Sequence, residues 1–307
     1  MSRLRKLMVG FVVVCISSWA WGQSVTSFTG PDRASAVSPT KGTSAASTGR
    51  TPIAPNGAFP RIGNIWIGNY VYQTDPAHAD KTQLYLGPNA LSANDASALH
   101  ADNPGVLILP SVNVADSGDE SLPDDYFLKD VNGKRIADWC SSPPGYVLNL
   151  TEPQVSTFLA NYALEQSTSA FDGAFFDSFS TTIPQPFTDC YGNQVRISSK
   201  NNGVPDNPDA LNAAWAAGEY LVVSAFRSLA PYTYLSGHVG DTPPDPGSLA
   251  AFNGTSIVFD AVNVREGLMA FGTLWNMYQT WEAQSVAPAI TMIQSSPCLD
   301  ERWILYL

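Results

Sequence analysis

The chain has 307 residues, of which 44% are hydrophobic, so it can form one large domain or two small ones around a sizeable core. Its 27 acidic and 16 basic residues give a formal charge of -11. Because nucleic acids and anionic membranes repel an acidic surface, this balance argues against either as a partner.

The first 22 residues have the pattern of a secretory signal peptide. Arg3, Arg5 and Lys6 precede the apolar run LMVGFVVVCI, and small residues at 20 and 22 form the cleavage site. The run is too short to span a bilayer comfortably, so we expect cleavage before Gln23 rather than an uncleaved membrane anchor. The mature protein would then be secreted or periplasmic, with no membrane insertion after signal cleavage.

Residues 23–60 are rich in Ser, Thr, Ala, Gly and Pro and show no apolar period, which predicts a flexible spacer. The pattern changes at residue 61, and residues 61–307 are predicted to form the folded domain.

Cleavage leaves Cys140, Cys190 and Cys298, and an exported compartment permits disulfides. Cys140 and Cys190 both lie in expected loops, so they are the favoured pair. No Cys–His spacing resembles a zinc site, and we expect neither a metal nor a cofactor.

Short, almost continuously apolar runs follow, which are typical of strands covered on both faces of a parallel sheet. The runs are residues 62–69, 82–87, 105–114, 173–179, 232–239, 256–262 and 287–294. Helical patterns lie between them, at residues 92–103, 151–166, 208–230 and 266–284. This alternation predicts an α/β fold, and its length favours a (β/α)8 TIM-type barrel over an open sheet.

The eighth strand of such a barrel is missing. Only thirteen residues follow Gln294, enough for about one short helix. An incomplete barrel would expose unpaired backbone at its edge, so we expect a C-terminally truncated chain instead.

Two polar insertions, residues 115–150 and 180–208, follow expected strand ends, where barrel enzymes place their active-site loops. Asn132 and Gly133 in the first insertion predict a hairpin turn. At the end of the second, the sequence Asn207-Pro208-Asp209 predicts a helix N-cap, a first-turn proline and an acid that matches the helix dipole. We prefer this capping interpretation to calcium binding by Asp206 and Asp209.

The stretch FDGAFFDSF, residues 171–179, contains two aspartates in an apolar run. Gly173, Phe175 and Asp177 share one side under period-two alternation, so Asp177 is expected at the mouth of the barrel. Asp172 lies at the other end of the strand on the opposite side, where we expect it to order the tight turn with Gly173. The alternative for Asp177 is a satisfied acid that accepts hydrogen bonds from loop amides.

Other polar residues also end the predicted strands, and strand ends of a barrel converge on one pocket. Flat aromatic rings near those ends can bury the faces of sugars, although ordinary packing would explain each ring separately. The predicted carbohydrate-binding residues are Trp66, Asn69, Tyr70, Asn113, Trp139, His238, Asn263 and Gln294.

Carboxylate chemistry is what the remaining residues support. The chain has no G-x-S-x-G serine elbow, no clustered metal ligands and no phosphate-cradling glycine loop. Glycoside hydrolysis needs two carboxyl groups across the scissile bond. Asp177 supplies one, Glu266 is our first choice for the other, and Asp260 is the second. Glu266 is equally well explained as an acid at a helix N-terminus, and Asp260 as a core acid tied to His238.

Three segments in order, YFLKDVNGKRIADW, YVLNLTEPQVSTFLANY and FDGAFFDSF, resemble the hypothetical glycosyl hydrolase family 15 of the α-galactosidase-like barrel superfamily. In such proteins a hairpin ending in Trp precedes an N-L-T-x-P-like segment, a helix and a D-G-x-x-x-D strand. The resemblance covers about residues 62–297. It implies a (β/α)8 barrel acting on glycans, with Asp177 as the nucleophile and an acid/base that maps onto Glu266 or Asp260. The missing eighth strand departs from the family pattern.

Three functional hypotheses follow from the sequence. The leading one is a secreted glycoside hydrolase with a carbohydrate substrate. The second is a non-catalytic polysaccharide-binding barrel, which keeps the aromatic cleft without a working acid pair. The third is a structural envelope protein with the spacer as a stalk, which predicts no convergence of polar residues at the strand ends.

Overall fold

The computed structural model describes residues 63–65, 84–87, 91–167, 170–184, 186–239, 252–259, 276, 279, 283–286 and 292–295. The predicted signal peptide and spacer lie outside these ranges. Within the described part of the chain, no helix combines the length and the hydrophobicity that a membrane crossing needs.

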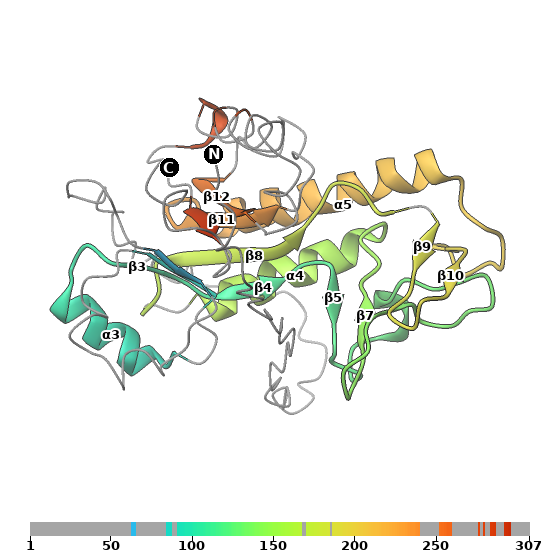
Figure 1. Ribbon diagram of the computed structural model, residues 1–307, viewed down its shortest axis with the longest axis horizontal. Helices are drawn as coiled ribbons and strands as arrows, with labels where there is room; N and C mark the ends of the chain where they lie inside the picture. Colours follow the sequence, from blue (N-terminus) through green and yellow to red (C-terminus); the bar gives the residue numbers. More distant parts are fainter. Residues whose placement is uncertain are drawn as a thin grey trace, which may run out of the picture.

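Parallel strands follow one another in chain order (Figure 1). One sheet contains β1 (Gly63–Ile65), β2 (Leu84–Leu86) and β3 (Leu107–Leu109). The other has the order β4-β8-β11-β12-β13, formed by β4 (Ser111–Asn113), β8 (Gly173–Phe179), β11 (Tyr234–Val239), β12 (Gly254–Phe259) and β13 (Met292–Ser295). All the predicted apolar runs therefore contain strands. Neighbours in chain order are the arrangement of a (β/α)8 barrel, but the closed barrel and its missing eighth strand stay predictions.

Pro110 divides the predicted run 105–114 into two strands. Proline has no amide hydrogen to donate to a sheet, so the ladder is interrupted there. Its carbonyl still accepts a hydrogen bond from the Phe175 amide at 2.8 Å. The two sheets therefore continue into each other across this residue.

Three helices lie in the described domain: α3 (Ala93–Asp102), α4 (Pro153–Gln166) and α5 (Pro208–Leu229). The side chain of Asn207 accepts hydrogen bonds from the amides of Asp209 and Ala210 at 3.0 and 3.1 Å, and Pro208 occupies the first turn of α5. The capping prediction is therefore confirmed. The predicted helix at 266–284 lies mostly outside the described residues.

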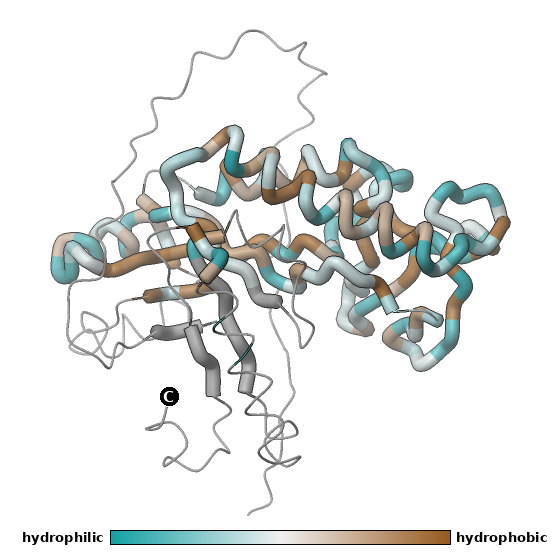
Figure 2. Tube along the Cα trace, turned by 90° about the horizontal axis from the view of Figure 1, so that it is seen from above, coloured by the Kyte–Doolittle hydropathy of each residue, from teal (hydrophilic) through white to brown (hydrophobic). Residues whose placement is uncertain are grey.

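The strands pack differently on their two faces. On one face Tyr85 and Ile108 contact α3, and Ala174 and Phe176 belong to the cluster that includes α4 and α5. The opposite face has its own apolar cluster, formed by Leu84, Leu86, Leu107, Leu109, Phe175 and Tyr234. Figure 2 shows brown apolar residues along the central strands, whereas the loops of the insertions are largely hydrophilic. The helices thus cover one face of the strands, and Phe175 lies on the opposite face.

Asp172 and Gly173 join β8 to its neighbours. The carboxylate of Asp172 accepts a hydrogen bond from the Ile108 amide at 2.9 Å and lies 3.2 Å from Nε2 of His100. A Cβ on Gly173 would lie 1.8 Å from the carbonyl oxygen of Tyr234, so only glycine fits there. Asp172 thus has a structural role that joins the start of β8 to β3 and α3, whereas its ordering of the turn with Gly173 stays a prediction.

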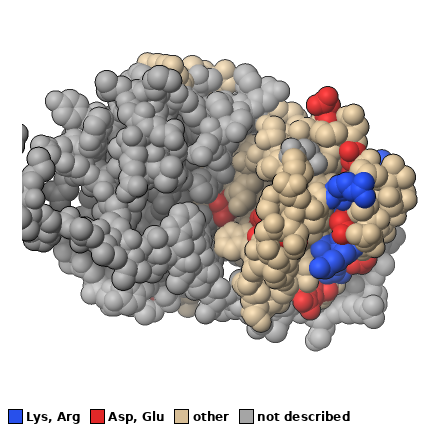
Figure 3. Space-filling view, turned by 45° about the vertical axis from the view of Figure 1, so that its right-hand side comes forward, with Lys and Arg blue, Asp and Glu red and all other residues tan. Residues whose placement is uncertain are grey.

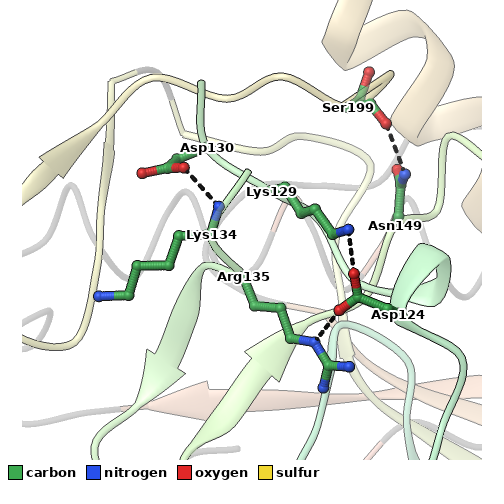
Figure 4. Close-up of polar contacts among 7 residues, drawn as sticks. All are labelled: Asp124, Lys129, Asp130, Lys134, Arg135, Asn149 and Ser199. Atoms are coloured by element: carbon green, nitrogen blue, oxygen red, sulfur yellow. Dashed lines mark hydrogen bonds and ion pairs between the residues drawn. The ribbon is translucent and has the colours of Figure 1, made fainter. Parts of the chain in front are cut away.

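The two insertions pack together beyond the ends of β4 and β8. The first contains β5 (Asp116–Ser117), η1 (Asp124–Tyr126), β6 (Ala137–Trp139) and β7 (Gly145–Val147), and the second contains β9 (Phe187–Thr188) and β10 (Gln194–Val195). Cys140 and Cys190 form a disulfide with their Cα atoms 5.5 Å apart, which confirms the predicted pair. Asn149 adds a hydrogen bond to the Ser199 carbonyl at 3.0 Å (Figure 4).

Charged side chains order the hairpin of the first insertion. Asp124 accepts from Lys129 and from Nε of Arg135, the latter at 2.7 Å (Figure 4), and both contacts lower the pKa of Asp124. The Arg135 guanidinium lies 4.0 Å from the centre of the Phe127 ring. Gly133 has a φ of +78° in the predicted turn, which is therefore confirmed. Figure 3 shows basic side chains gathered at one end, beside acidic ones.

Candidate functional site

Asn113 and Asp177 lie side by side at the carboxyl ends of neighbouring parallel strands. The register pairs Ser111 with Phe175 and Asn113 with Asp177. Side chains alternate along a strand, so Asp177 lies on the same face as Phe175, two residues before it. The backbone of Asp177 is fixed to the same neighbour, since its carbonyl accepts from the Val114 amide at 3.1 Å. The predicted placement of these two residues at one edge of the sheet is confirmed.

A bulge in β8 contains Asp177. Phe176 pairs with Gly237 and Phe179 pairs with Val239, so β8 has one more residue than β11 over this stretch. Ser178, inside the bulge, has a φ of +57°, in the left-handed region that residues other than glycine seldom adopt. Bulges change the direction in which a strand presents its side chains and often occur beside active sites.

Asp116 joins this pair and was missed in the sequence. Oδ1 of Asn113 accepts from the amides of Ala115 and Asp116 at 2.9 and 3.1 Å, and its Nδ2 donates to Oδ2 of Asp116 at 2.8 Å. Trp139 donates from Nε1 to the same carboxylate oxygen at 3.0 Å. The sequence did contain a signal for this group: Asp116 comes three residues after Asn113, which ends a predicted strand. Asparagine side chains often bind the backbone of the turn that follows them.

Burial raises the pKa of Asp116 to about 7, and the nearby charge of Asp138 adds to the effect. The hydrogen bonds from Asn113 and Trp139 act in the opposite direction, and the charge of Asp177 raises the pKa further. The residue is only 9% exposed, so solvent screens these effects weakly. A carboxyl group with this pKa exchanges its proton near neutral pH, as general acids and bases in enzymes do.

Asp138 itself lies beside this group on β6. Partial removal from water raises the pKa of its carboxyl group, while a hydrogen bond with Trp139 acts in the opposite direction. The site is thus acidic, with Asp116 and Asp138 beside the Trp139 indole and the charge of Asp177 close enough to affect Asp116. Among the described residues, no group of three His, Cys, Asp or Glu side chains is placed to hold a metal ion.

The remaining predicted site residues are not tested. His238 lies in β11 and Gln294 in β13, paired with Val258, but their side chains lie outside the described structure. The residues that lie wholly outside it are Trp66, Asn69, Tyr70, Asp260, Asn263 and Glu266. The structure therefore brings together Asn113, Trp139 and Asp177, adds Asp116, and leaves the sixth-strand carboxylate a prediction.

No protein-family model and no curated protein matches the sequence. The structure is similar to the glycoside hydrolase domain of PelA from Pseudomonas aeruginosa, with a TM-score of 0.42 and 14% identity, over 64% of this chain and 67% of that one. It is also similar to an α-galactosidase from Thermus thermophilus in complex with stachyose (TM-score 0.43, 17% identity, 76% of this chain and 54% of that one). A GH36 α-galactosidase from Geobacillus stearothermophilus has a TM-score of 0.48 at 13% identity, over 80% of this chain and 40% of that one. The chain thus spans less than two thirds of the length of these α-galactosidases.

Proposed function

We propose that this protein is a glycoside hydrolase that cleaves a poly- or oligosaccharide with a pair of carboxyl groups. The observation that carries the proposal is the arrangement around Asn113, which pairs in the strand register with Asp177 and donates a hydrogen bond to Asp116, a carboxyl group whose pKa is raised by burial and, to a smaller extent, by the charge of Asp177. Two carboxyl groups in different protonation states are what glycoside hydrolysis requires.

In this proposal Asp177 is the nucleophile, and the proton donor is Asp116 or one of the sixth-strand carboxylates. Asp116 is supported by its hydrogen bond with Asn113, the register partner of Asp177, and by a pKa of about 7. Glu266 and then Asp260 are supported by their predicted positions at the end of the sixth strand. Trp139, whose ring is partly exposed at the edge of this site, would contact the sugar.

The test begins with the full-length protein and a panel of polysaccharides. Asp177→Asn keeps the shape of the side chain and removes its charge, so it should abolish hydrolysis and leave the fold and most of the glycan affinity intact. Asp102→Asn, at an exposed position of α3, is the matched control and should keep full activity. Full activity of Asp177→Asn on a substrate that the wild type cleaves would contradict the nucleophile assignment.

Substrates with different leaving groups can identify the residue that donates the proton. An activated aryl glycoside needs no protonation as it departs, so it should rescue a variant that lacks the acid and leave a variant that lacks the nucleophile inactive. Asp116→Asn, Glu266→Gln and Asp260→Asn are compared in this way. The variant that loses activity on the natural substrate and regains it on the aryl glycoside marks the acid.

A polysaccharide-binding protein without catalysis is the second candidate. One observation favours it: Oδ2 of Asp116 already accepts from both Asn113 and Trp139, as a carboxylate with a structural role would. This alternative predicts glycan binding that Asp177→Asn does not weaken, together with no release of reducing ends by the wild type.

Export to the periplasm or the medium is part of the proposal, with cleavage before Gln23. The Cys140–Cys190 disulfide supports it, because cytosolic thiols are kept reduced. N-terminal sequencing of exported protein tests it, and a membrane-bound form that retains Met1 would contradict it.

A further inference from the structure

Three side chains of α5 bind the segment that follows Asp177. Trp215 donates from Nε1 to the Ser180 carbonyl at 2.7 Å, and Glu219 accepts from the Ser180 amide at 3.4 Å through Oε1. Asn212 accepts from the Ile183 amide at 2.8 Å. These positions are three and four residues apart, so they form one stripe along the helix. The stripe therefore contacts the chain at both ends of the Ser180–Ile183 segment.

Glu219 is an unusual member of this stripe. It is 0% exposed, on the buried face of α5 that includes Trp215, Val222 and Val223. Its second oxygen, Oε2, has no hydrogen-bond partner among the described residues. Burial raises the pKa of Glu219 well above its usual value. An apolar residue would avoid the loss of hydration at this position, so packing alone does not explain a carboxyl group there.

The segment that the stripe contacts begins just after a strained residue. Ser178 adopts its left-handed φ of +57° in the bulge, two residues before Ser180. Such conformations persist only where the surrounding structure holds them. The backbone before Ser178 is held by β4, through the bond from the Val114 amide to the Asp177 carbonyl. The backbone after it is held by Trp215 and Glu219.

We propose that Glu219, together with Trp215 and Asn212, is a positioning residue that maintains the bulge at Ser178 and so sets the direction of the Asp177 side chain. The proposal rests on the proposed function for what Asp177 does, but the geometry can be tested without a substrate. Glu219 touches neither Asp177 nor the sugar in this account, so it acts through the backbone alone.

The experiment compares backbone NMR spectra of the full-length wild type with those of Glu219→Leu and Glu219→Gln. Leucine removes the acceptor for the Ser180 amide, so hydrogen exchange at that amide should rise about tenfold, the factor that one lost hydrogen bond represents. The three-bond coupling and carbon shifts of Ser178 should move away from left-handed values. Glutamine keeps a carbonyl oxygen that can accept from the Ser180 amide, so it should restore both signals.

Val223→Ala is the matched control, a buried truncation on the same helix. It should lower the stability of the fold without a change at Ser178. If Glu219→Leu does not fold, Asn212→Ala replaces it in the test. The measurements are then hydrogen exchange at the Ile183 amide and the coupling and carbon shifts of Ser178. Unchanged Ser178 signals in Glu219→Leu, or the same change in Val223→Ala, would overturn the proposal.

Hydrolysis provides a separate measurement. With a cleaved substrate in hand, Glu219→Leu should lower kcat about tenfold or more at an unchanged KM, since it would misdirect the nucleophile without touching the sugar. Glu219→Gln should keep wild-type kcat. If the wild type cleaves no polysaccharide, the proposed function fails, whereas the NMR result still decides whether Glu219 maintains the bulge.

Discussion

Nε1 of Trp139 donates a hydrogen bond to Oδ2 of Asp116 across 3.0 Å, and this contact joins two strands of the first insertion. The two residues are 23 positions apart in the chain and lie on β6 and β5. The residue that follows Trp139 is Cys140, which the disulfide joins to the second insertion. Both insertions therefore support the group that holds Asp116.

Trp139→Phe should raise the pKa of Asp116 above about 7. The hydrogen bond from the indole stabilises the charged carboxylate and so lowers the pKa. Without it, burial and the charge of Asp138 raise the pKa further. A carboxyl-carbon NMR titration measures the change. Tyr191→Phe, at an exposed ring of the second insertion, should leave the titration unchanged. A lower pKa in Trp139→Phe would show that the indole does not stabilise the charged form.

Asp116→Asn should change how stability depends on pH. The folded protein holds the Asp116 proton up to about pH 7, whereas the unfolded chain loses it near its ordinary pKa of 3.8. The folded state therefore binds more protons between these values, and its stability falls as pH rises through this window, by up to about 4 kcal/mol.

Asparagine cannot ionise, so Asp116→Asn should be more stable than the wild type at about pH 8 and no more stable at about pH 4. Urea unfolding at the two pH values measures the difference. Part of the fall in stability with rising pH should remain in Asp116→Asn, because the raised pKa of Glu219 also makes the folded state less stable as pH rises. Parallel curves for the two proteins would contradict the raised pKa of Asp116.

Gly173→Ala should prevent folding or destabilise the protein by about 3 kcal/mol or more, because the added methyl group would collide with the Tyr234 backbone. Gly105→Ala is the control, since the nearest atom to its new Cβ is a side-chain oxygen of Asn103 at 3.7 Å. It should change stability by about 0.5 kcal/mol at most. Thermal and urea unfolding of the two variants compare them directly, and similar losses would argue against the close approach of β8 and β11.

Removing the disulfide with Cys140→Ser and Cys190→Ser together should destabilise the protein by about 2–4 kcal/mol, because the bridge closes a loop between residues 50 positions apart. The same loss should follow when the wild type is unfolded in the presence of a reductant, and the reductant should not affect the double variant. A reductant effect on the double variant would indicate that another thiol is responsible.

Local signals in the sequence determined much of the fold. Apolar runs predicted the positions of the parallel strands, and Asn132-Gly133 and Asn207-Pro208 predicted a turn and a helix start, because these preferences act within a few residues. The Cys140–Cys190 pair was also predicted, since both cysteines lie in segments expected to be loops. The position of Asp177 beside Asn113 near the end of a strand was also predicted, because alternation along a strand defines the side on which a residue lies.

Tertiary structure alone decided which side chains meet at that strand end. Asp116 gained its raised pKa from burial and from the charges of Asp138 and Asp177, none of which is set by its own neighbours in sequence. Glu219 is a polar residue in an apolar helical stripe, and only the packing of α5 against the segment after β8 shows which amide it accepts from. The bulge at Ser178 is likewise decided by tertiary structure and not by its neighbours in sequence. Hydrogen bonds and desolvation depend on distances between parts of the chain that only the folded molecule brings together.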